Sequence, residues 1–374
     1  MSNRWTVRGR TLALLVASLF TAACALSDGS AVNGGDRNSS CADLPVAAEP
    51  REAGWDPAGF EQLRGLAEEA DASAVMIVTG GEIVFSYGPT DRPMFLASVR
   101  KSVLSALIGI AVEEGVLELD DTVVRWGIDD DPPLMESERE ATLRDLISLR
   151  SGVYLPTAAE SPRMRDNRPA RGSRDPGSFW FYNNWDFNVA GAIFERATRK
   201  SVFLAFQHFI AEPLCMQDFD AYEHTWYLYT DAAPRYPAYH MALSARDLAR
   251  FGMLYLQDGV WAGERILPEG WIAESTAPIS ATQEEPELAS GYGYMWWVTA
   301  DVPTGKSGQM LAGSYTAMGS GGQRMTVLPA IDTVILARAD TKPGGIGASA
   351  FRDTTLWQAF VVSALALRRD PRNL

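Results

Sequence analysis

The stretch over residues 98–115 constrains what this 374-residue chain can fold into more than any other segment. Its apolar residues fall on all sides of a helix, and Gly115 is placed to end that helix. A helix without a polar face has to be surrounded by protein, so we expect this segment in the interior of a domain. The apolar positions are Val99, Val103, Leu104, Leu107, Ile108, Ile110 and Val112.

The composition allows such an interior and limits the classes of ligand. Hydrophobic residues make up 47% of the chain and charged residues 21%, which is ordinary for one large or two smaller globular domains. The net charge of -14 disfavours nucleic acid and acidic membrane surfaces as partners. The histidines are His208, His224 and His240, too few to favour a multi-histidine metal site, and we expect no metal or organic cofactor.

The N-terminus has the pattern of an export signal. Arg4, Arg8 and Arg10 precede an apolar run over residues 11–23 that is too short to span a bilayer comfortably. A basic start, an apolar middle and small residues near a cleavage point predict a signal peptide over residues 1–23.

The residues that follow predict a tether. Thr21-Ala22-Ala23-Cys24 resembles a bacterial lipobox in which Cys24 carries the lipid, and cleavage near Ala25 without lipidation is the alternative. Residues 24–50 are rich in small and polar residues, which is typical of a flexible segment. We therefore expect an exported protein, periplasmic or at the cell surface, with membrane attachment through Cys24 if that residue is lipidated.

Two further cysteines leave two alternatives open. Cys41 and Cys215 form a disulfide if the compartment is oxidising. Otherwise Cys41 is a mobile residue and Cys215 a buried free thiol.

Patterns along the mature chain predict an α+β fold. Strand patterns occur near both ends and helical patterns between them, without the regular alternation of a doubly wound sheet. Residues 74–88 predict a hairpin, and residues 155–178 predict a loop. The expected helices are 57–70, 98–115, 141–150, 185–212, 244–257 (with Ser244 as N-cap) and 346–368, and the expected C-terminal strands are 291–299, 314–318, 323–328 and 333–337.

Ser98 and Lys101 form the pair with the clearest chemistry. Residues three apart lie one turn from each other on a helix face, so the two side chains can touch. A serine hydroxyl becomes a nucleophile when a base takes its proton, and burial lowers the pKa of a lysine enough for it to be that base. The short pattern also arises by chance, in which case Ser98 is an N-cap and Lys101 a surface residue.

A second motif, Tyr182-Asn183-Asn184, follows an aromatic run. The Tyr182 hydroxyl can share or relay the serine proton, and the Asn184 amide can hold a substrate carbonyl. The alternative is an aromatic core cluster. Phe179, Trp180 and Trp185 suggest an apolar wall for a substrate.

Together, S-x-x-K at 98–101 and Y-x-N at 182–184 resemble the serine β-lactamase and penicillin-binding protein superfamily. The resemblance covers residues 55–365, almost the whole mature chain. It implies an α/β domain from 51–97 and 245–374 with an antiparallel sheet flanked by helices, a mainly helical domain from 98–244, and a cleft between them. The similar segments are 95–103, 115–121, 143–152, 175–184, 244–252 and 291–297.

The third motif of that superfamily, Lys-Thr-Gly or His-x-Gly on a strand, is altered here. Ala317-Met318-Gly319 has strand character and precedes Gly321 and Gly322, which places an alanine where the cation usually stands. Lys306-Ser307-Gly308 is the competing candidate. The missing cation makes the chain more similar to the family VIII-type esterases and 6-aminohexanoate-dimer hydrolases than to β-lactamases or D,D-peptidases.

The resemblance implies a serine hydrolase that cleaves a small ester or linear amide through an acyl-serine. Ser98 is the expected nucleophile, with Lys101 and Tyr182 as acid and base. The backbone N–H groups of Ser98 and Ser320 are the expected oxyanion hole. The expected substrate contacts are Asn184, Trp180, Trp185, Ala317 and Gly319. The alternative is a catalytically weak penicillin-binding or cell-wall sensor lipoprotein of the same fold.

Overall fold

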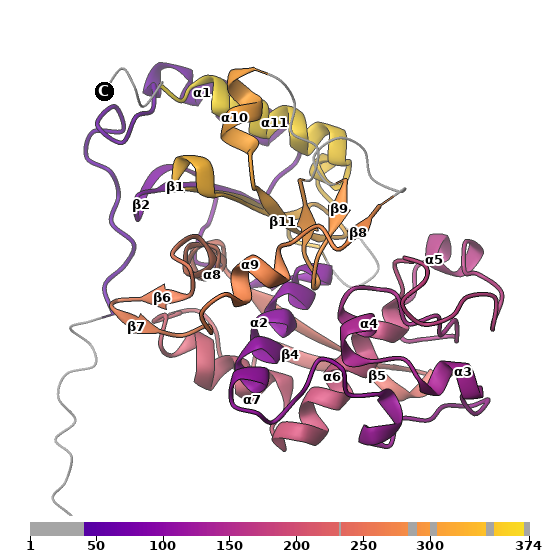
Figure 1. The fold of residues 1–374 in the computed structure, drawn as a ribbon. Coiled ribbons are helices and arrows are strands. Elements are labelled where there is room, and N and C mark those ends of the chain that lie inside the picture. The colour runs from indigo at the N-terminus through magenta and orange to yellow at the C-terminus, as the bar shows by residue number, and fades with distance from the viewer. Residues whose placement is uncertain (1–40, 232, 283–289, 300–304, 342–347, 370–374) are drawn as a thin grey trace, which may run out of the picture. The chain divides into compact units, whose positions relative to one another are not determined.

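The computed structural model of the protein describes residues 41–231, 233–282, 290–299, 305–341 and 348–369 (Figure 1). The expected signal peptide 1–23, Cys24 and the tether up to residue 40 lie outside these ranges. Within them, segments from both ends of the chain build one sheet, and the middle of the chain builds a second, mainly helical region.

The larger sheet is antiparallel and, within the described residues, has eight strands. Because β1 pairs with β2 on one side and with β13 on the other, the two ends of the chain share this sheet. The expected hairpin and the expected C-terminal strands all belong to it. The order is β2 (Glu82–Tyr87), β1 (Ala74–Thr79), β13 (Thr333–Arg338), β12 (Gln323–Leu328), β11 (Tyr315–Gly319), β10 (Trp297–Val298), β9 (Gly291–Tyr292) and β8 (Ser280–Ala281).

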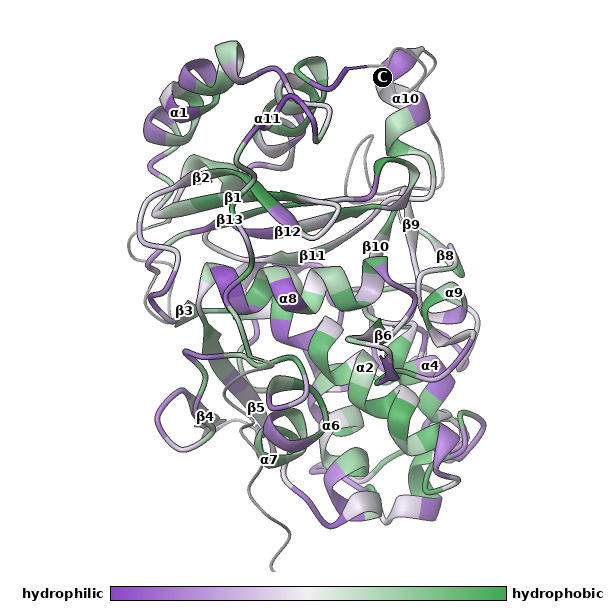
Figure 2. Ribbon diagram, turned by 90° about the vertical axis from the view of Figure 1, so that its left-hand side faces the viewer, coloured by the Kyte–Doolittle hydropathy of each residue, from purple (hydrophilic) through white to green (hydrophobic). Residues whose placement is uncertain are grey.

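Helices cover both faces of this sheet (Figure 2). α1 (Phe60–Glu69) and α11 (Thr354–Ala366) lie on one face, and α8 (Ala245–Leu256) lies on the other. A strand that is covered on both sides needs apolar residues, or polar residues with hydrogen-bond partners, at every position. Every residue of β1, β12 and β13 is buried. The predicted antiparallel sheet flanked by helices is confirmed.

The predicted buried helix is α2 (Arg100–Glu113), at the junction between the sheet and the second region (Figure 1). Of its residues only Ile110, Val112 and Glu113 are not buried. The second region also contains α3 (Glu136–Arg139), α4 (Leu143–Ile147), α5 (Pro162–Asp166), α6 (Asn184–Thr198) and α7 (Val202–Phe206).

Part of the region expected to be mainly helical is a sheet. β3 (Met94–Phe95), β5 (Ala233–Leu243) and β4 (Thr225–Thr230) form three neighbouring strands. The prolines in the second half of this hairpin conceal the strand pattern, because proline cannot donate to a sheet. Pro237 is accommodated because β3 pairs only with the last residues of β5, at Ala242 and Leu243.

Several helix boundaries also differ from the expected ones. The expected helix 185–212 is divided, because Arg199 has a positive φ of 56° after α6 and Ser201 caps α7. The expected loop 155–178 contains α5. Ser244 caps α8 as predicted, through its hydroxyl and the Asp247 N–H. The remaining short elements are β6 (Val260–Trp261), β7 (Glu264–Arg265), α9 (Trp271–Ser275) and α10 (Lys306–Leu311).

The tether ends earlier than residue 50. Pro45 and Ala47 exchange backbone hydrogen bonds with Ile83 of β2, so this part of the chain is packed against the sheet. Cys41 forms a disulfide with Cys215, which corrects the alternative of a buried free thiol.

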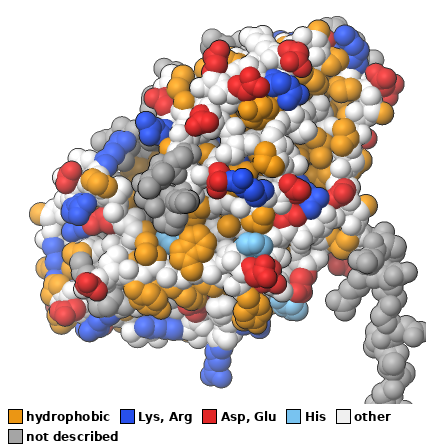
Figure 3. All heavy atoms as spheres, turned by 180° about the vertical axis from the view of Figure 1, so that it is seen from behind, with side chains coloured by type: hydrophobic (Ala, Val, Ile, Leu, Met, Phe, Trp, Pro, Cys, Tyr) orange, Lys and Arg blue, Asp and Glu red, His pale blue; other side chains and the backbone are white. Residues whose placement is uncertain are grey.

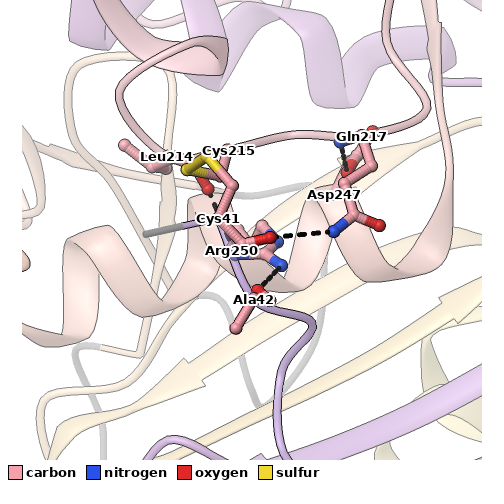
Figure 4. Close-up of a disulfide and its surroundings, with 7 residues drawn as sticks. All are labelled: Cys41, Ala42, Leu214, Cys215, Gln217, Asp247 and Arg250. Carbon is pink, nitrogen blue, oxygen red and sulfur yellow. Dashed lines mark hydrogen bonds between the residues drawn. A yellow bond between two sulfur atoms is a disulfide. The ribbon is translucent and has the colours of Figure 1, made fainter. Parts of the chain in front are cut away.

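The disulfide lies beside α8 (Figure 4). Arg250 donates hydrogen bonds to the carbonyl oxygens of Ala42 (2.7 Å) and Leu214 (3.2 Å), the residues next to the two cysteines. The segment that begins at Cys41 is thereby fixed to the body of the protein by a covalent bond and by hydrogen bonds.

The surface opposite the view of Figure 1 carries acidic, basic and hydrophobic side chains in a mixed pattern (Figure 3). Such a mixture lacks the continuous basic region that binding of nucleic acid through charge requires. None of the helices in the described ranges is long and apolar enough to cross a membrane.

Candidate active site

The turn that carries Ser98 has an uncommon backbone conformation. Ala97–Val99 forms a 3-10 turn directly before α2, and Ala97 has a positive φ of 49°. A non-glycine residue in this region is strained, and such strain is concentrated at functional sites. The guanidinium of Arg100 donates a hydrogen bond to the Ala97 carbonyl oxygen (2.8 Å), which helps to hold the turn. Ser98 does not cap α2, whose N-cap residue is Val99.

Lys101 lies one helical turn after Ser98, with its amine in a buried hydrogen-bond cluster. The Nζ atom is 3.1 Å from Ser98 Oγ, 2.8 Å from Tyr182 OH and 2.7 Å from Asn184 Oδ1. The side chain is only 1% exposed, and its Nζ atom also lies over the ring of Phe187. The structure thus brings together the four side chains that the two sequence motifs single out.

The surroundings disfavour the charged form of this amine. Burial lowers the pKa of Lys101 well below its ordinary value of 10.5, and the charge of Arg100 lowers it further. A neutral amine has a lone pair. In this form Lys101 can accept a proton from a neighbouring hydroxyl.

Asn184 holds the amine of Lys101 in place. Its Nδ2 donates to the carbonyl oxygen of Ala159 (2.5 Å), which turns its Oδ1 toward Lys101. The side chain is buried, and both amide atoms are engaged with protein. In this arrangement Asn184 positions the lysine, whereas the sequence analysis expects it to contact substrate.

A second buried cluster fixes the segment that carries Tyr182. Asp186 Oδ1 accepts hydrogen bonds from Ser151 Oγ (2.6 Å) and Asn183 Nδ2 (2.8 Å), and Asn183 also donates to the Val153 carbonyl oxygen (2.7 Å). Burial raises the pKa of Asp186 well above its ordinary value. The sequence offers one local indication of this cluster, the asparagine between Tyr182 and Asn184, and the other residues were not predicted.

The aromatic wall around Tyr182 contains Trp180, one of the three residues expected for it. The ring of Tyr182 is stacked on Trp297 with centroids 5.6 Å apart, and Trp180 contacts both Trp297 and Tyr292. Trp185 does not belong to this wall: it is 1% exposed, and its indole donates to Asp130 Oδ2 (2.7 Å) in the core of the helical region. Its position in the first turn of α6 turns it toward the core of the helical region and away from the aromatic wall.

The strand β11 brings the third motif to the serine. A Cβ on Gly319 would lie 2.5 Å from the Leu96 carbonyl oxygen, so only glycine allows β11 to approach the turn before Ser98 this closely. Ala317 is buried on the same strand, and Ser320 follows it as an exposed residue. β11 therefore ends beside the turn that carries Ser98, and the N–H of Ser320 comes directly after this end.

The competing candidate for the third motif lies elsewhere. Lys306 begins α10, and its Nζ donates to the carbonyl oxygen of Arg368 (2.9 Å), beyond the end of α11. Strand geometry therefore favours Ala317-Met318-Gly319, and the position usually held by a cation carries an alanine.

A pocket of about 340 Å³ adjoins the aromatic wall. Trp180 belongs to its lining and is two residues from Tyr182, at most ~7 Å along a fully extended chain. The described lining is Arg150, Asn167, Pro169, Ser178, Phe179, Trp180, Phe181, Ile279, Ser280 and Ala281.

In the described ranges, no group of three or more His, Cys, Asp or Glu side chains is arranged to hold a metal ion.

Comparisons with known proteins find relatives in sequence and in fold. The chain is 24% identical over 340 residues to a 6-aminohexanoate-dimer hydrolase of Paenarthrobacter ureafaciens, covering 78% of this chain and 81% of that protein. An octameric penicillin-binding protein homologue of Pyrococcus abyssi has a similar fold, with a TM-score of 0.60, 18% identity and coverage of 85% and 78% of the two chains. EstCE1, described as a hydrolase with promiscuous acyltransferase activity, gives a TM-score of 0.57 at 17% identity, covering 83% of this chain and 99% of that one.

The family is shown by a match over most of the chain. The sequence model of the Beta-lactamase family matches residues 61–352, a range that contains Ser98, Lys101, Tyr182 and β11. The chain therefore belongs to the Beta-lactamase family, whose members are serine hydrolases.

Proposed function

We propose that the protein hydrolyses an ester or a linear amide through an acyl-serine intermediate. The observation that carries this proposal is the position of the buried Lys101 amine, 3.1 Å from Ser98 Oγ and 2.8 Å from Tyr182 OH. These distances let a proton leave the serine as its oxygen attacks.

The first half of the reaction forms the acyl-enzyme. Ser98 Oγ attacks the substrate carbonyl carbon while its proton passes to Lys101 and Tyr182. The oxyanion accepts hydrogen bonds from the backbone N–H groups of Ser98 and Ser320. As the carbonyl carbon–leaving group bond breaks, the same proton passes to the leaving oxygen or nitrogen. In the second half, water attacks the carbonyl carbon of the acyl-serine ester and gives a proton to Lys101 and Tyr182. As the bond between this carbon and Ser98 Oγ breaks, that proton passes to Oγ, which releases the acid and free Ser98.

The substrate class follows from β11. Ala317 offers no charge where relatives that recognise β-lactams carry Lys or His, so the site lacks that partner for a β-lactam carboxylate. Esters and linear amides are therefore the proposed substrates, as the name of the Paenarthrobacter ureafaciens relative suggests for amides. We expect little hydrolysis of a chromogenic cephalosporin.

Labelling with a fluorophosphonate probe tests the nucleophile. Intact-mass spectrometry should find one adduct on the wild-type protein and none on Ser98→Ala. Ser137→Ala, which alters an exposed serine of α3, is the matched control and should be labelled like the wild type. Labelling of Ser98→Ala, or no labelling of the wild type, would contradict the proposal and favour a binding protein of the same fold.

We also propose that the protein is exported and lipid-anchored at Cys24. The disulfide between Cys41 and Cys215 supports export, because disulfides persist in oxidising compartments. Expression in a bacterial host should place the wild type in the detergent phase of a Triton X-114 partition. Cys24→Ser should move to the aqueous phase, and equal partition of the two would refute the anchor.

A further inference from the structure

The pocket beside the aromatic wall is lined by buried polar atoms without a hydrogen-bond partner, and most of these atoms are donors. Three polar side-chain atoms of its described lining are buried without a hydrogen-bond partner: Arg150 Nε, Trp180 Nε1 and Ser280 Oγ. Buried polar atoms in native proteins are nearly always paired, so three unpaired ones around one pocket indicate a ligand that pairs with them. The first two are donors only, and such a ligand must therefore offer acceptor oxygens.

The charge of the lining also favours an anion. Arg150 is the cation of the described lining, which contains no aspartate or glutamate. Its Nη2 donates to the Gly177 carbonyl oxygen, a neutral partner, and none of the ion pairs among the described residues involves it. Arg174 adds a second positive charge, since its guanidinium lies 4.5 Å from the centre of the Phe179 ring.

The carboxylate of Asp145 lies close to Gly177 but forms no ion pair with this arginine. Asp145 Oδ2 accepts hydrogen bonds from the backbone N–H of Thr142 (2.9 Å) and from its hydroxyl (2.7 Å). It therefore serves as part of the cap of α4, while the fork of Arg150 remains without an acidic partner in the described ranges.

From these contacts we infer that the pocket binds a carboxylate carried by the substrate at a distance from the bond that is cut. Arg150 takes the role of the cation that Ala317 cannot supply. The apolar part of the lining, Phe179, Phe181 and Ile279, packs against the chain between the carboxylate and the reacting carbonyl. The inference rests on the proposed hydrolase function and adds a substrate class: linear esters or amides with a terminal carboxylate.

The position of the pocket sets the expected chain length. Trp180 lines the pocket, and its ring contacts Trp297, on which Tyr182 is stacked. A carboxylate at Arg150 is therefore at least one aromatic ring away from the reacting carbonyl. Longer dicarboxylic acid esters should be favoured over shorter ones.

The test compares kcat/KM for pairs of esters that differ only in terminal charge. The mono-p-nitrophenyl esters of adipic and suberic acid are matched with p-nitrophenyl hexanoate and octanoate. A second pair, 4-(butyryloxy)benzoate and its methyl ester, places the carboxylate in the leaving group. For each pair, the kcat/KM of the charged ester is divided by that of the neutral ester. This ratio does not depend on the fraction of active protein, so partial misfolding does not change it.

Arg150→Gln should reduce that ratio at least about tenfold in one of the two series, and Arg150→Lys should restore part of it. Arg165→Gln removes an exposed charge of α5 and should leave the ratio unchanged. An unchanged ratio in Arg150→Gln, or an equal loss in Arg165→Gln, would overturn the inference while the hydrolase proposal stands. Absence of Ser98-dependent hydrolysis of the neutral esters would instead overturn the hydrolase proposal itself.

Discussion

Lys101 Nζ lies 2.7 Å from Asn184 Oδ1, an atom that can only accept a hydrogen bond. One N–H of the neutral amine must therefore point at the asparagine. The contacts of Nζ with Ser98 Oγ and Tyr182 OH are then the ones available to its lone pair and its second hydrogen. The asparagine thus directs the basic side of the lysine toward the serine and the tyrosine.

Replacing Asn184 by aspartate should suppress activity at neutral pH. A carboxylate this close to Lys101 stabilises the ammonium form and raises its pKa by about one to three units. The acid limb of the kcat/KM profile should move to higher pH by that amount, with activity recovering in alkaline buffer. Asn184→Ala, which adds no charge, is the control. An unshifted profile for Asn184→Asp would contradict a neutral Lys101.

Arg100 should also influence the acid limb of the pH profile of kcat/KM, because its charge acts on Lys101. Its positive charge lowers the pKa of Lys101, so Arg100→Met should raise that pKa and shift the acid limb upward by roughly one unit. Arg100→Lys keeps the charge but removes the guanidinium N–H that donates to the Ala97 carbonyl oxygen. It should therefore lower kcat while leaving the limb in place. Equal shifts in both variants would show that the charge is not the cause.

His240 should make the folded state sensitive to acid. Burial, aided by Arg100 and Lys101, lowers its pKa to about 2 from the ordinary 6.5. Below pH 6.5 the unfolded chain binds a proton that the folded protein does not, so stability is full above that pH and falls as the pH falls. The loss amounts to about 1.4 kcal/mol at pH 5.5.

Urea unfolding at pH 7.5 and 5.5 checks this expectation. His240→Phe, which keeps an aromatic ring beside Phe95 and Trp226, should lose less stability between the two pH values than the wild type. His208→Asn, at an exposed histidine, is the control and should behave like the wild type. The same acid loss in His240→Phe would refute a buried neutral His240.

The disulfide should contribute substantially to stability. It closes a long loop, with a sequence separation of 174 residues, and removing such a link typically costs about 2–5 kcal/mol. The double variant Cys41→Ser, Cys215→Ser should unfold at lower urea concentration than the wild type in non-reducing buffer. A reductant should lower the urea midpoint of the wild type to that of the double variant. If the two proteins have equal midpoints without reductant, the bond does not stabilise the fold.

Local patterns explain what could be predicted from the sequence. The pairing of Ser98 with Lys101 depends on helical spacing, and the burial of α2 depends on apolar residues around the whole helix. The strand expected over residues 314–318 follows from its local pattern, and β11 is present there. Each of these needs only a short segment and the geometry of a helix or strand.

Features that join distant segments could not be predicted in this way. The cluster of Asp186 with Ser151 links residues 35 apart in the sequence, and nothing local marks the pairing. Trp185 was assigned to the substrate wall because it follows other aromatic residues, whereas its place in α6 turns it to Asp130. The hairpin containing β5 was missed because its prolines are typical of loops.

Trapping of the acyl-enzyme during turnover tests the central claim most directly. Rapid acid quench of the protein with p-nitrophenyl hexanoate, followed by intact-mass and peptide mass spectrometry, should find a hexanoyl group on Ser98. An initial burst of p-nitrophenol should accompany it if deacylation is the slower step, and Ser98→Ala should give neither adduct nor turnover. Turnover that persists in Ser98→Ala, or an acyl group on another residue, would contradict the mechanism.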